Sequence, residues 1–557
     1  MRKYLNIKKD IVLAVISVLF GILNVAGQSM YFEDCLPVGM GIRPILSALG
    51  FAVIYSVVFY IAACALLSLF DKMELKQGEK PKRLKGIWRY ADNHIFWVSF
   101  FFILIMWLPW VIVYYPASMD WDVYRQLSSY LGIWAHSNHD PWFSSCVLGI
   151  CYQLGVKLGS ENLGIFIFVI IRDILMAFIY AKCIQVLKKA GLKRWIYYLA
   201  LCFYAVTPVW GAYSKHAFKD TFCCALFVWY IISLIVLIMN QKEGDLKRKH
   251  CVSYGTSALF LSLFRNNCVY VAAPITFLVV IYLLVKREKR IYSILIVALL
   301  GIYFAFNSFI FNYCGVEPGS GREALSIPFQ QTARTVRDHS DEITEEERMA
   351  INNLLDYDSM AENYDPLLSD PIKDHMKSGV GKEAITDYFI TWFKMFFKYP
   401  WTYIEAGLGQ SYGYYAFTPR FPYGAGNYNS GMTIFNWIQV DAFQEYYSFH
   451  YVEQWEKGRN VLADWADLWD KIPVLNWTNK IPLYTWSIFL LGYYLLKKRR
   501  LADVLPVLAL LIMILTCMAS PVNGCFRYFA PVAASSPALL LLLGRRSKRN
   551  VPDDREL

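Results

Sequence analysis

Long apolar runs are the feature that most limits the folds open to this chain. A bilayer core is about 30 Å thick, so a helix needs about 20 apolar residues to cross it. Runs of roughly this length recur along the 557 residues, of which 56% are hydrophobic and only 18% are charged. Soluble domains usually carry about 25% charged residues. The sequence therefore predicts an all-α polytopic membrane protein with about twelve transmembrane helices.

Short basic clusters between the runs predict the topology. The expected spans are 11–27, 45–70, 94–114, 162–184, 195–213, 219–240, 252–264, 268–285, 291–312, 482–496, 502–519 and 529–543. Clusters such as "KREKR" (286–290) and "KKRR" (497–500) mark cytoplasmic loops by the positive-inside rule. Threading the spans with both termini in the cytoplasm places all such clusters on that side. The net charge of +11 is thus explained by topology, and we expect no nucleic-acid partner.

Two long segments then fall on the extracytoplasmic side, a loop over 115–160 and an insert over 313–480. The insert holds 24 Asp and Glu against 14 Lys and Arg, a net charge of −10, which suits an external location. We expect an exposed helix over 341–356 and aromatic helices lying at the membrane interface over 385–408, because Trp and Tyr concentrate there.

Four parts of the chain follow from this threading. The predicted division is 1–93 (transmembrane hairpin and cytoplasmic loop), 94–312 (transmembrane core with the outer loop), 313–480 (external insert) and 481–557 (C-terminal helices and cytoplasmic tail).

The outer loop contains paired carboxylates beside the membrane boundary. Asp120 and Asp122 precede Gln126, which shares a helical face with Asp122 if 121–131 is helical. His139 and Asp140 follow just before the next apolar segment. A single Asp at this place would be read as a helix N-cap. The whole set, next to apolar surface, favours a catalytic or substrate-binding role.

Four further polar clusters map to the same outer face. They comprise Lys219 and Asp220; Arg265, Asn266 and Asn267; Gln330, Gln331 and Arg334; and Arg527. Bland alternatives are snorkelling lysines, a structural ion pair between Arg265 and Asp220, and ordinary solvated turns. Arginine in a membrane is expensive, however, by at least about 2.5 kcal/mol on insertion scales, and needs a partner or ligand.

A carboxylate base beside a cationic cluster suits group transfer from a lipid phosphate. The base would deprotonate an acceptor hydroxyl, and Lys219, Arg265, Arg334 and Arg527 would bind the phosphate as it leaves. No cofactor follows from the sequence. Asp120, Asp122, His139 and Asp140 could hold a divalent cation, although such oxygen-rich sets are not diagnostic.

These residues also carry a family resemblance. The layout resembles GT-C superfamily glycosyltransferases, and more closely an uncharacterised bacterial family of multi-pass proteins related to them. "YPASMDWDVYRQL" is similar to that family's Tyr-Pro-Gly…Asp…Gln segment, with Ala117 in place of its usual Gly. "NHDPW" is similar to its His-His-Pro element, with Asp140 replacing the second His. "FKDT", "FRNN" and "IPFQQTAR" look like further elements.

The resemblance implies transfer of a sugar from a polyprenyl-phosphate donor to an extracytoplasmic glycan or lipid acceptor. It implies Asp122 as the base, with Asp120 as the rival. A lipid or glycan flippase or transporter is the main alternative, and a lipid-linked glycan polymerase and a structural scaffold are others. Charged residues along the spans would favour a transporter.

Overall fold

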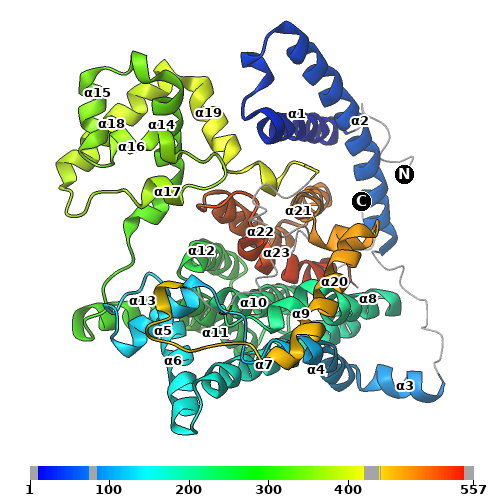
Figure 1. The fold of residues 1–557 in the computed structure, drawn as a ribbon. Coiled ribbons are helices and arrows are strands. Elements are labelled where there is room, and N and C mark those ends of the chain that lie inside the picture. Colours follow the sequence, from blue (N-terminus) through cyan, green and yellow to red (C-terminus); the bar gives the residue numbers. More distant parts are fainter. Residues whose placement is uncertain (1–9, 74–84, 420–437, 439–440, 545–557) are drawn as a thin grey trace.

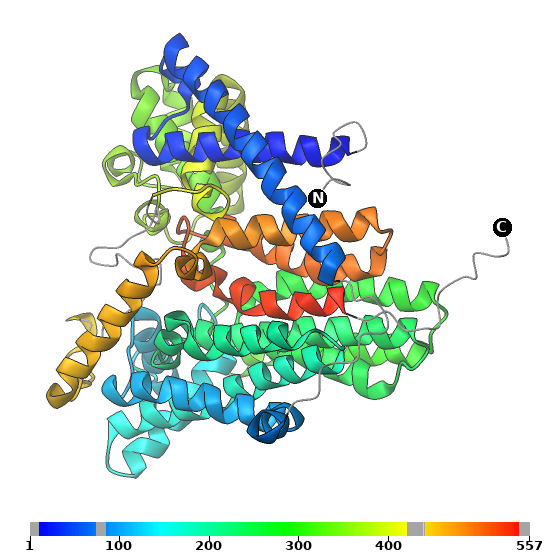
Figure 2. The same cartoon turned by 90° about the vertical axis from the view of Figure 1, so that its right-hand side faces the viewer.

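The computed structural model describes residues 10–73, 85–419, 438 and 441–544. Within these ranges the chain is helical, with isolated β-bridges and no strand longer than a bridge. The helices form a large bundle, with a smaller lobe and the N-terminal helix hairpin lying to one side of it in both views (Figures 1 and 2). The all-α class is confirmed.

Nine helical segments of the described residues are long and apolar enough to cross a bilayer. They correspond to α1 (Ile11–Glu33), α2 (Ile42–Met73), α4 (Ile95–Val113), α7 (Glu161–Lys189), α10 (Lys219–Lys242), α12 (Val269–Val285), α13 (Arg290–Tyr313), α22 (Val504–Met518) and α23 (Phe526–Leu539). The segments of α12, α22 and α23 each include an adjoining 3-10 turn. The protein is thus a multi-pass membrane protein.

The remaining three expected spans also fall on helices. A tenth crossing would be the pair α8 (Arg194–Val206) and α9 (Pro208–Ser214), which is bent by 47°. The ranges 252–264 and 482–496 lie in α11 (Arg248–Phe264) and α21 (Ile481–Lys497), which have only 17 residues each. The count of twelve therefore stays a prediction.

Helix α10 forms the centre of the bundle. It is apolar on every side, and 83% of its most apolar stretch is buried. Such a helix must be surrounded by others, and α7, α11 and α23 pack against it. The first residues of α10, Lys219 and Asp220, are therefore held at the end of the bundle by helices on several sides.

Ion pairs join helix ends that the predicted topology places on the same side of the membrane. Lys497 and Lys498, at the end of α21, pair with Asp10 before α1 and with Asp71 in α2. Lys242, at the end of α10, lies 2.6 Å from a carboxylate oxygen of Asp503 before α22. That this end faces the cytoplasm stays a prediction.

The first part of the insert folds into a lobe with its own core. It comprises α14 (Ser326–His339), α15 (Glu345–Asn352), α16 (Tyr357–Asn363), α17 (Asp370–Lys373), α18 (Lys382–Lys398) and α19 (Pro400–Gly409). Phe329, Leu354, Tyr388 and Tyr403 are buried in this core. The lobe contacts α1 through α19.

The later part of the insert lies elsewhere. Phe443, Tyr447 and Phe449 pack against α5 (Trp121–Leu131), the helix of the outer loop. Helix α20 (Glu456–Lys471) then contacts α4 and α9. The insert 313–480, which was expected as one unit, therefore has two parts that pack against different helices.

Candidate functional site

The paired carboxylates of the outer loop lie at the start of α5. Asp120 is the N-cap, and one carboxylate oxygen accepts a hydrogen bond from the Val123 amide at 3.3 Å. Just before it, Ser118 forms a parallel β-bridge with His216, which lies in the segment that leads into α10. The Ser118 amide donates to the Lys215 carbonyl at 2.9 Å. This bridge places the start of α5 beside the start of α10.

Arg527, near the start of α23, joins three carboxylates. Its guanidinium donates to Asp120 at 2.6 Å, to Asp220 at 2.7 Å and to Asp122. The guanidinium carbon also lies 4.8 Å from the ring centroid of Phe218. One arginine therefore ties α23 to the first residues of α5 and α10.

Three further cations complete the charge balance. Arg125 lies 2.7 Å from Asp122 and 2.6 Å from Asp140. Lys219 contacts the same two carboxylates, with 3.2 Å to Asp122. Arg265 pairs with Asp220 at 3.1 Å. This is the structural ion pair that the sequence analysis gave as an alternative to a ligand-binding role for Arg265.

We call these eight side chains the ion-pair cluster: Asp120, Asp122, Arg125, Asp140, Lys219, Asp220, Arg265 and Arg527. Four carboxylates face four cations, so the cluster is formally neutral. It is also largely buried: the side chains of Asp120, Asp140 and Asp220 are 7%, 5% and 3% exposed, against 23% for Asp122.

The two carboxylates of the pair have opposite acid–base properties. Burial raises the pKa of Asp120 to about 6, against the opposing effect of Arg527. Burial also opposes ionisation of Asp122, but Lys219, Arg527 and Arg125 together hold its pKa well below the usual range. Asp122 is thus a permanently ionised partner of three cations, while Asp120 is the carboxylate that can exchange a proton near neutral pH.

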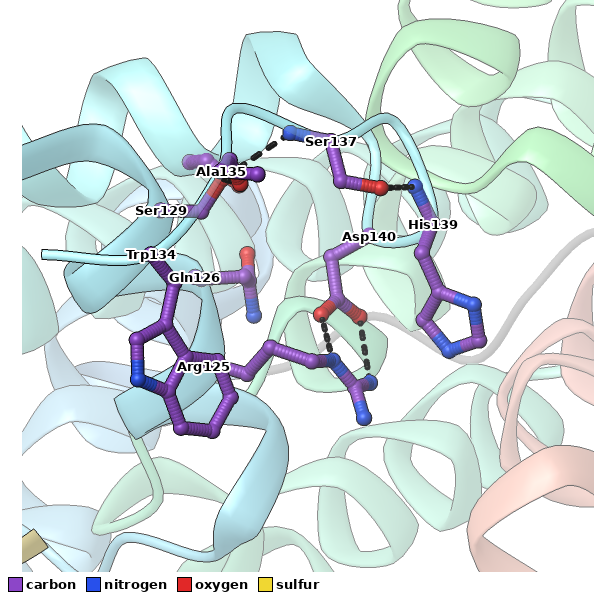
Figure 3. A pocket seen from close by; sticks show the side chains of 9 residues that line it. Arg125, Gln126, Ser129, Trp134, Ala135, Ser137, His139 and Asp140 are labelled. Atoms are coloured by element: carbon purple, nitrogen blue, oxygen red, sulfur yellow. Dashed lines mark hydrogen bonds and ion pairs between the residues drawn. The ribbon is translucent and has the colours of Figure 1, made fainter. Parts of the chain in front are cut away.

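A small cavity lies against the Arg125–Asp140 ion pair (Figure 3). Its volume is about 260 Å³, and its lining comes from α5, the loop that follows and the start of α6 (Trp142–Lys157). The lining residues are Arg125, Gln126, Ser129, Trp134, Ala135, Ser137, His139, Asp140 and Ser145. The imidazole of His139 lies beside the Arg125 guanidinium (Figure 3). Burial, with help from Arg125, lowers the pKa of His139.

The loop that carries His139 is held from three directions. The Asn138 amide donates to the Glu317 carbonyl at 2.8 Å, and the Glu317 amide donates to the His136 carbonyl at 2.8 Å. The Asn266 side chain donates to the Asn138 carbonyl at 2.8 Å. In turn, the Asn138 side chain accepts a hydrogen bond from the amide of Trp142, the first residue of α6. Asn266 therefore positions the cavity loop.

Two other expected residues have different places. Gln126 donates to the Asp122 carbonyl at 3.2 Å and accepts from Ser144 at 2.9 Å, which fixes α5 to α6. Asn267 is exposed in the short turn η3 (Asn266–Cys268). Of these two residues, only Gln126 both hydrogen-bonds to the backbone of a cluster residue and lines the cavity.

Gln330, Gln331 and Arg334 do not join the cluster. They lie in α14 of the lobe, where Arg334 pairs with Asp34 at 2.9 Å and with Glu405 at 3.0 Å. Gln330 donates to the Asp365 carbonyl and Gln331 to the Tyr403 carbonyl. The structure therefore does not bring Arg334 together with Lys219, Arg265 and Arg527, with which the sequence grouped it. A shared outer face did not imply a shared site, because the lobe folds around its own core.

Two sets of charged residues were not singled out from the sequence. Arg125 lies three residues after Asp122, a spacing that brings side chains together on a helix. Arg172 and Asp173 form a buried ion pair of 2.8 Å inside α7. In "IIRDILM" they interrupt an apolar run, a signal that was available.

Metal binding finds no support in the described ranges, where no group of three or more His, Cys, Asp or Glu side chains is arranged to hold an ion. The carboxylates of the outer loop face arginine and lysine instead.

The fold and this cluster define an all-α multi-pass membrane protein with a neutral, buried ionic site at one end of its bundle. A family model matches residues 135–557, and the chain belongs to that family, DUF6020, a family of unknown function. No curated protein and no solved structure matches the chain. Of the cluster, Asp120, Asp122 and Arg125 precede the matched region.

Proposed function

We propose that the protein is an integral membrane glycosyltransferase that transfers a sugar from a polyprenyl-phosphate donor to an extracytoplasmic glycan or lipid acceptor. The observation that carries the proposal is the ion-pair cluster beside a small cavity at one end of a transmembrane bundle. The bilayer would deliver the lipid donor to that end in a fixed orientation. The GT-C resemblance of the same segments adds to it.

A phosphate has to compete with carboxylates in this site, because the cluster is already neutral. Arg125 and Lys219 are the cations for such an exchange. The Arg125 side chain is 25% exposed and its partner Asp122 is 23% exposed, whereas Lys219, Arg265 and Arg527 are 12%, 11% and 10% exposed. Lys219 takes part in the exchange because it contacts the same two carboxylates as Arg125. A phosphate accepts paired hydrogen bonds from guanidinium as a carboxylate does, so the exchange conserves the hydrogen bonds of Arg125.

The test uses the purified full-length protein in lipid nanodiscs with labelled polyprenyl-phosphate sugars. We expect donor binding and sugar transfer by the unaltered protein. Lys219→Gln should weaken donor binding by at least tenfold, because one phosphate-binding charge is lost. The matched control is Lys398→Gln, which removes an ion pair with Glu347 in the lobe. Absence of transfer across a range of donors would remove the proposal.

A transporter or flippase is the second candidate, favoured by one observation. The Arg172–Asp173 pair is buried inside a candidate span, and one polar atom on each side chain has no hydrogen-bond partner. Ionisable residues at such depth often mark ion or substrate pathways. Asp173→Asn should abolish substrate movement into vesicles if this reading is correct. Full transport by this variant would count against it.

A further inference from the structure

We propose that the cavity beside Arg125 and Asp140 is the acceptor site, that it holds one sugar-sized polyol, and that His139 takes the proton from the acceptor hydroxyl. The inference deepens the proposed function and rests on it for the chemical step. It assigns a ligand class to the cavity and a catalytic role to His139. The ion-pair cluster alone gives neither.

The size and lining of the cavity point to a small polyhydroxylated ligand. Its volume of about 260 Å³ is below the ≈ 300–1,000 Å³ of drug-sized pockets, so it suits one sugar ring and not a polyprenyl chain. Most of the wall that it exposes is apolar, and Trp134 is its one large aromatic side chain. Hydroxyl, amide and charged side chains among the lining residues supply a few polar atoms. A sugar ring offers the matching surfaces: hydroxyls at its edge and C–H groups on its face.

The Trp134 ring belongs to an aromatic group. Trp134 packs at 4.9 Å between ring centroids against Phe443, and Trp121 packs at 4.9 Å against the same ring. The segment after the lobe therefore packs against the indole. A preorganised ring is what selective binding of a weakly held ligand requires.

Neither carboxylate of the sequence pair is placed to accept the acceptor's proton in this cavity. Asp122 is shared by three cations, which stabilise its anion and make it a weak base. Asp120 is buried, with one oxygen capping α5 and the other bound to Arg527. Both are absent from the cavity lining.

His139 lines the cavity directly and is held by its backbone. The charged groups that face its ring are Arg125 from α5, Asp140 from its own loop, Glu323 from η4 (Gly321–Leu325) and Lys219 from α10. Burial and Arg125 lower its pKa, so the ring is neutral at pH 7 and can accept a proton. Arg125 belongs to both the cavity and the cluster, so a phosphate bound there would lie next to the acceptor.

The step balances as follows. The bond between the anomeric carbon of the donor sugar and the phosphate oxygen breaks, and its electron pair stays on the phosphate. A bond forms between that carbon and the acceptor oxygen. The proton of the acceptor hydroxyl moves to the free ring nitrogen of His139 and passes from there to water.

Ligand binding is tested without any transfer reaction. Methyl glycosides of glucose, mannose, galactose and N-acetylglucosamine are added at up to roughly 100 mM, and diethyl pyrocarbonate modification of each histidine is followed by peptide mass spectrometry. We expect at least one glycoside to slow modification of His139 about fivefold or more, with the exposed His375 and His450 unaffected. Trp134→Ala should remove the protection, and Trp401→Ala, in the lobe, should not. Lack of protection by all four glycosides overturns the cavity assignment even if the protein transfers sugar.

The proton role is tested by the pH profile of transfer. In the unaltered protein kcat/KM should fall as pH falls through the lowered pKa of His139, because the protonated ring cannot accept a proton. His139→Gln should lose this acid limb and about 10²–10⁴-fold of the rate, with donor binding kept. An acid limb that persists in His139→Gln and disappears in Asp120→Asn overturns the role of His139. Glycoside protection without transfer by any donor supports the sugar site and overturns the proposed function instead.

Discussion

Two buried ionic networks in this protein look alike in composition and differ in what surrounds them. The ion-pair cluster joins α5, α10, α11 and α23 and borders a cavity. The second network joins the α1 C-cap Asp34 to the lobe through Arg334, Arg337, Asp338 and Glu405. In the first, Arg125, Lys219 and Arg527 each contact two or three carboxylates from separate segments of the chain, next to a space that a ligand can enter. In the second, the arginines fasten one unit to another.

The comparison shows that a buried arginine with acidic partners does not by itself identify a binding site. The Arg334 side chain is only 2% exposed, less than the 10% of Arg527. What separates the two is the cavity: Arg125 and Asp140 of the cluster line it, and no residue of the second network does. Substitutions in the two networks should therefore have different effects on stability and on ligand binding.

Arg527→Ala should have the largest effect. It leaves Asp120, Asp122 and Asp220 without their shared guanidinium. Removing one partner of a buried ion pair costs about 3–5 kcal/mol, so we expect a large fall in Tm in detergent and loss of donor binding. Arg348→Ala, at a surface pair with Asp358 in the lobe, is the control. A Tm within experimental error of the unaltered protein would mean that the cluster adds little to the fold.

Asp122→Asn should destabilise the protein more than Asp120→Asn at pH 7. Asp122 is held ionised by three cations, and each loses a partner charge in the variant. Loss of a buried charge partner costs about 3–5 kcal/mol. Burial raises the pKa of Asp120 to about 6, so its ionised form is already disfavoured and a neutral amide costs less. Equal shifts in Tm would show that the two carboxylates share the cations evenly.

The pH dependence gives the same comparison a second readout. A folded-state pKa of about 6 for Asp120 lies above its unfolded value of about 3.9. Its contribution to stability is therefore full below about pH 3.9 and is lost as pH rises through 6. The lowered pKa of Asp122 acts in the opposite sense, and its contribution is lost as pH falls below its unfolded value. Asp120→Asn should reduce the fall in Tm between pH 5 and 7.

The sequence predicted the helical spans more reliably than the site. Apolar length and positive loops are local signals, so each expected span falls on a helix. The helix expected over 341–356 is shorter and spans Glu345–Asn352. It begins after Thr344, which forms a capping box with Glu347, and the acidic residues before Thr344 lie outside the helix. Asp120 has the N-cap role that its position suggested.

The partners of the charged residues were harder to predict, because pairing depends on which helix ends meet. Arg265 with Asp220 could be named from the threading, but Arg334 with Asp34 spans 300 residues of sequence and crosses two units. The cavity depends on the backbone bridge between Asn138 and Glu317. Neither residue type nor spacing indicates such a contact.

Arg334→Ala should sharpen the contrast between the networks. It leaves Glu405 and Asp34 without their shared guanidinium, but these carboxylates are 13% and 33% exposed and water can solvate them in part. We expect about 1–3 kcal/mol of destabilisation, the typical cost of an unsatisfied buried polar group, and faster hydrogen exchange in α14 and α19. Donor binding per folded molecule should change less than about twofold. A loss as large as that of Lys219→Gln would place the lobe network in the site.

Arg337→Ala should have the smallest effect and separates burial from charge within the second network. Arg337 pairs with Asp34 at 2.9 Å and with Asp338 at 2.7 Å, and its guanidinium carbon lies 4.6 Å from the Tyr364 ring centroid. Its side chain is 31% exposed, however, against 2% for Arg334. Ion pairs with this much exposure are worth about 0.2–1 kcal/mol, and salt screens them. We therefore expect a small fall in Tm that disappears at high ionic strength, whereas the effect of Arg334→Ala persists there. Equal effects for both arginines at high salt would show that net charge at the α1 C-cap, and not burial of one guanidinium, fastens the hairpin to the lobe.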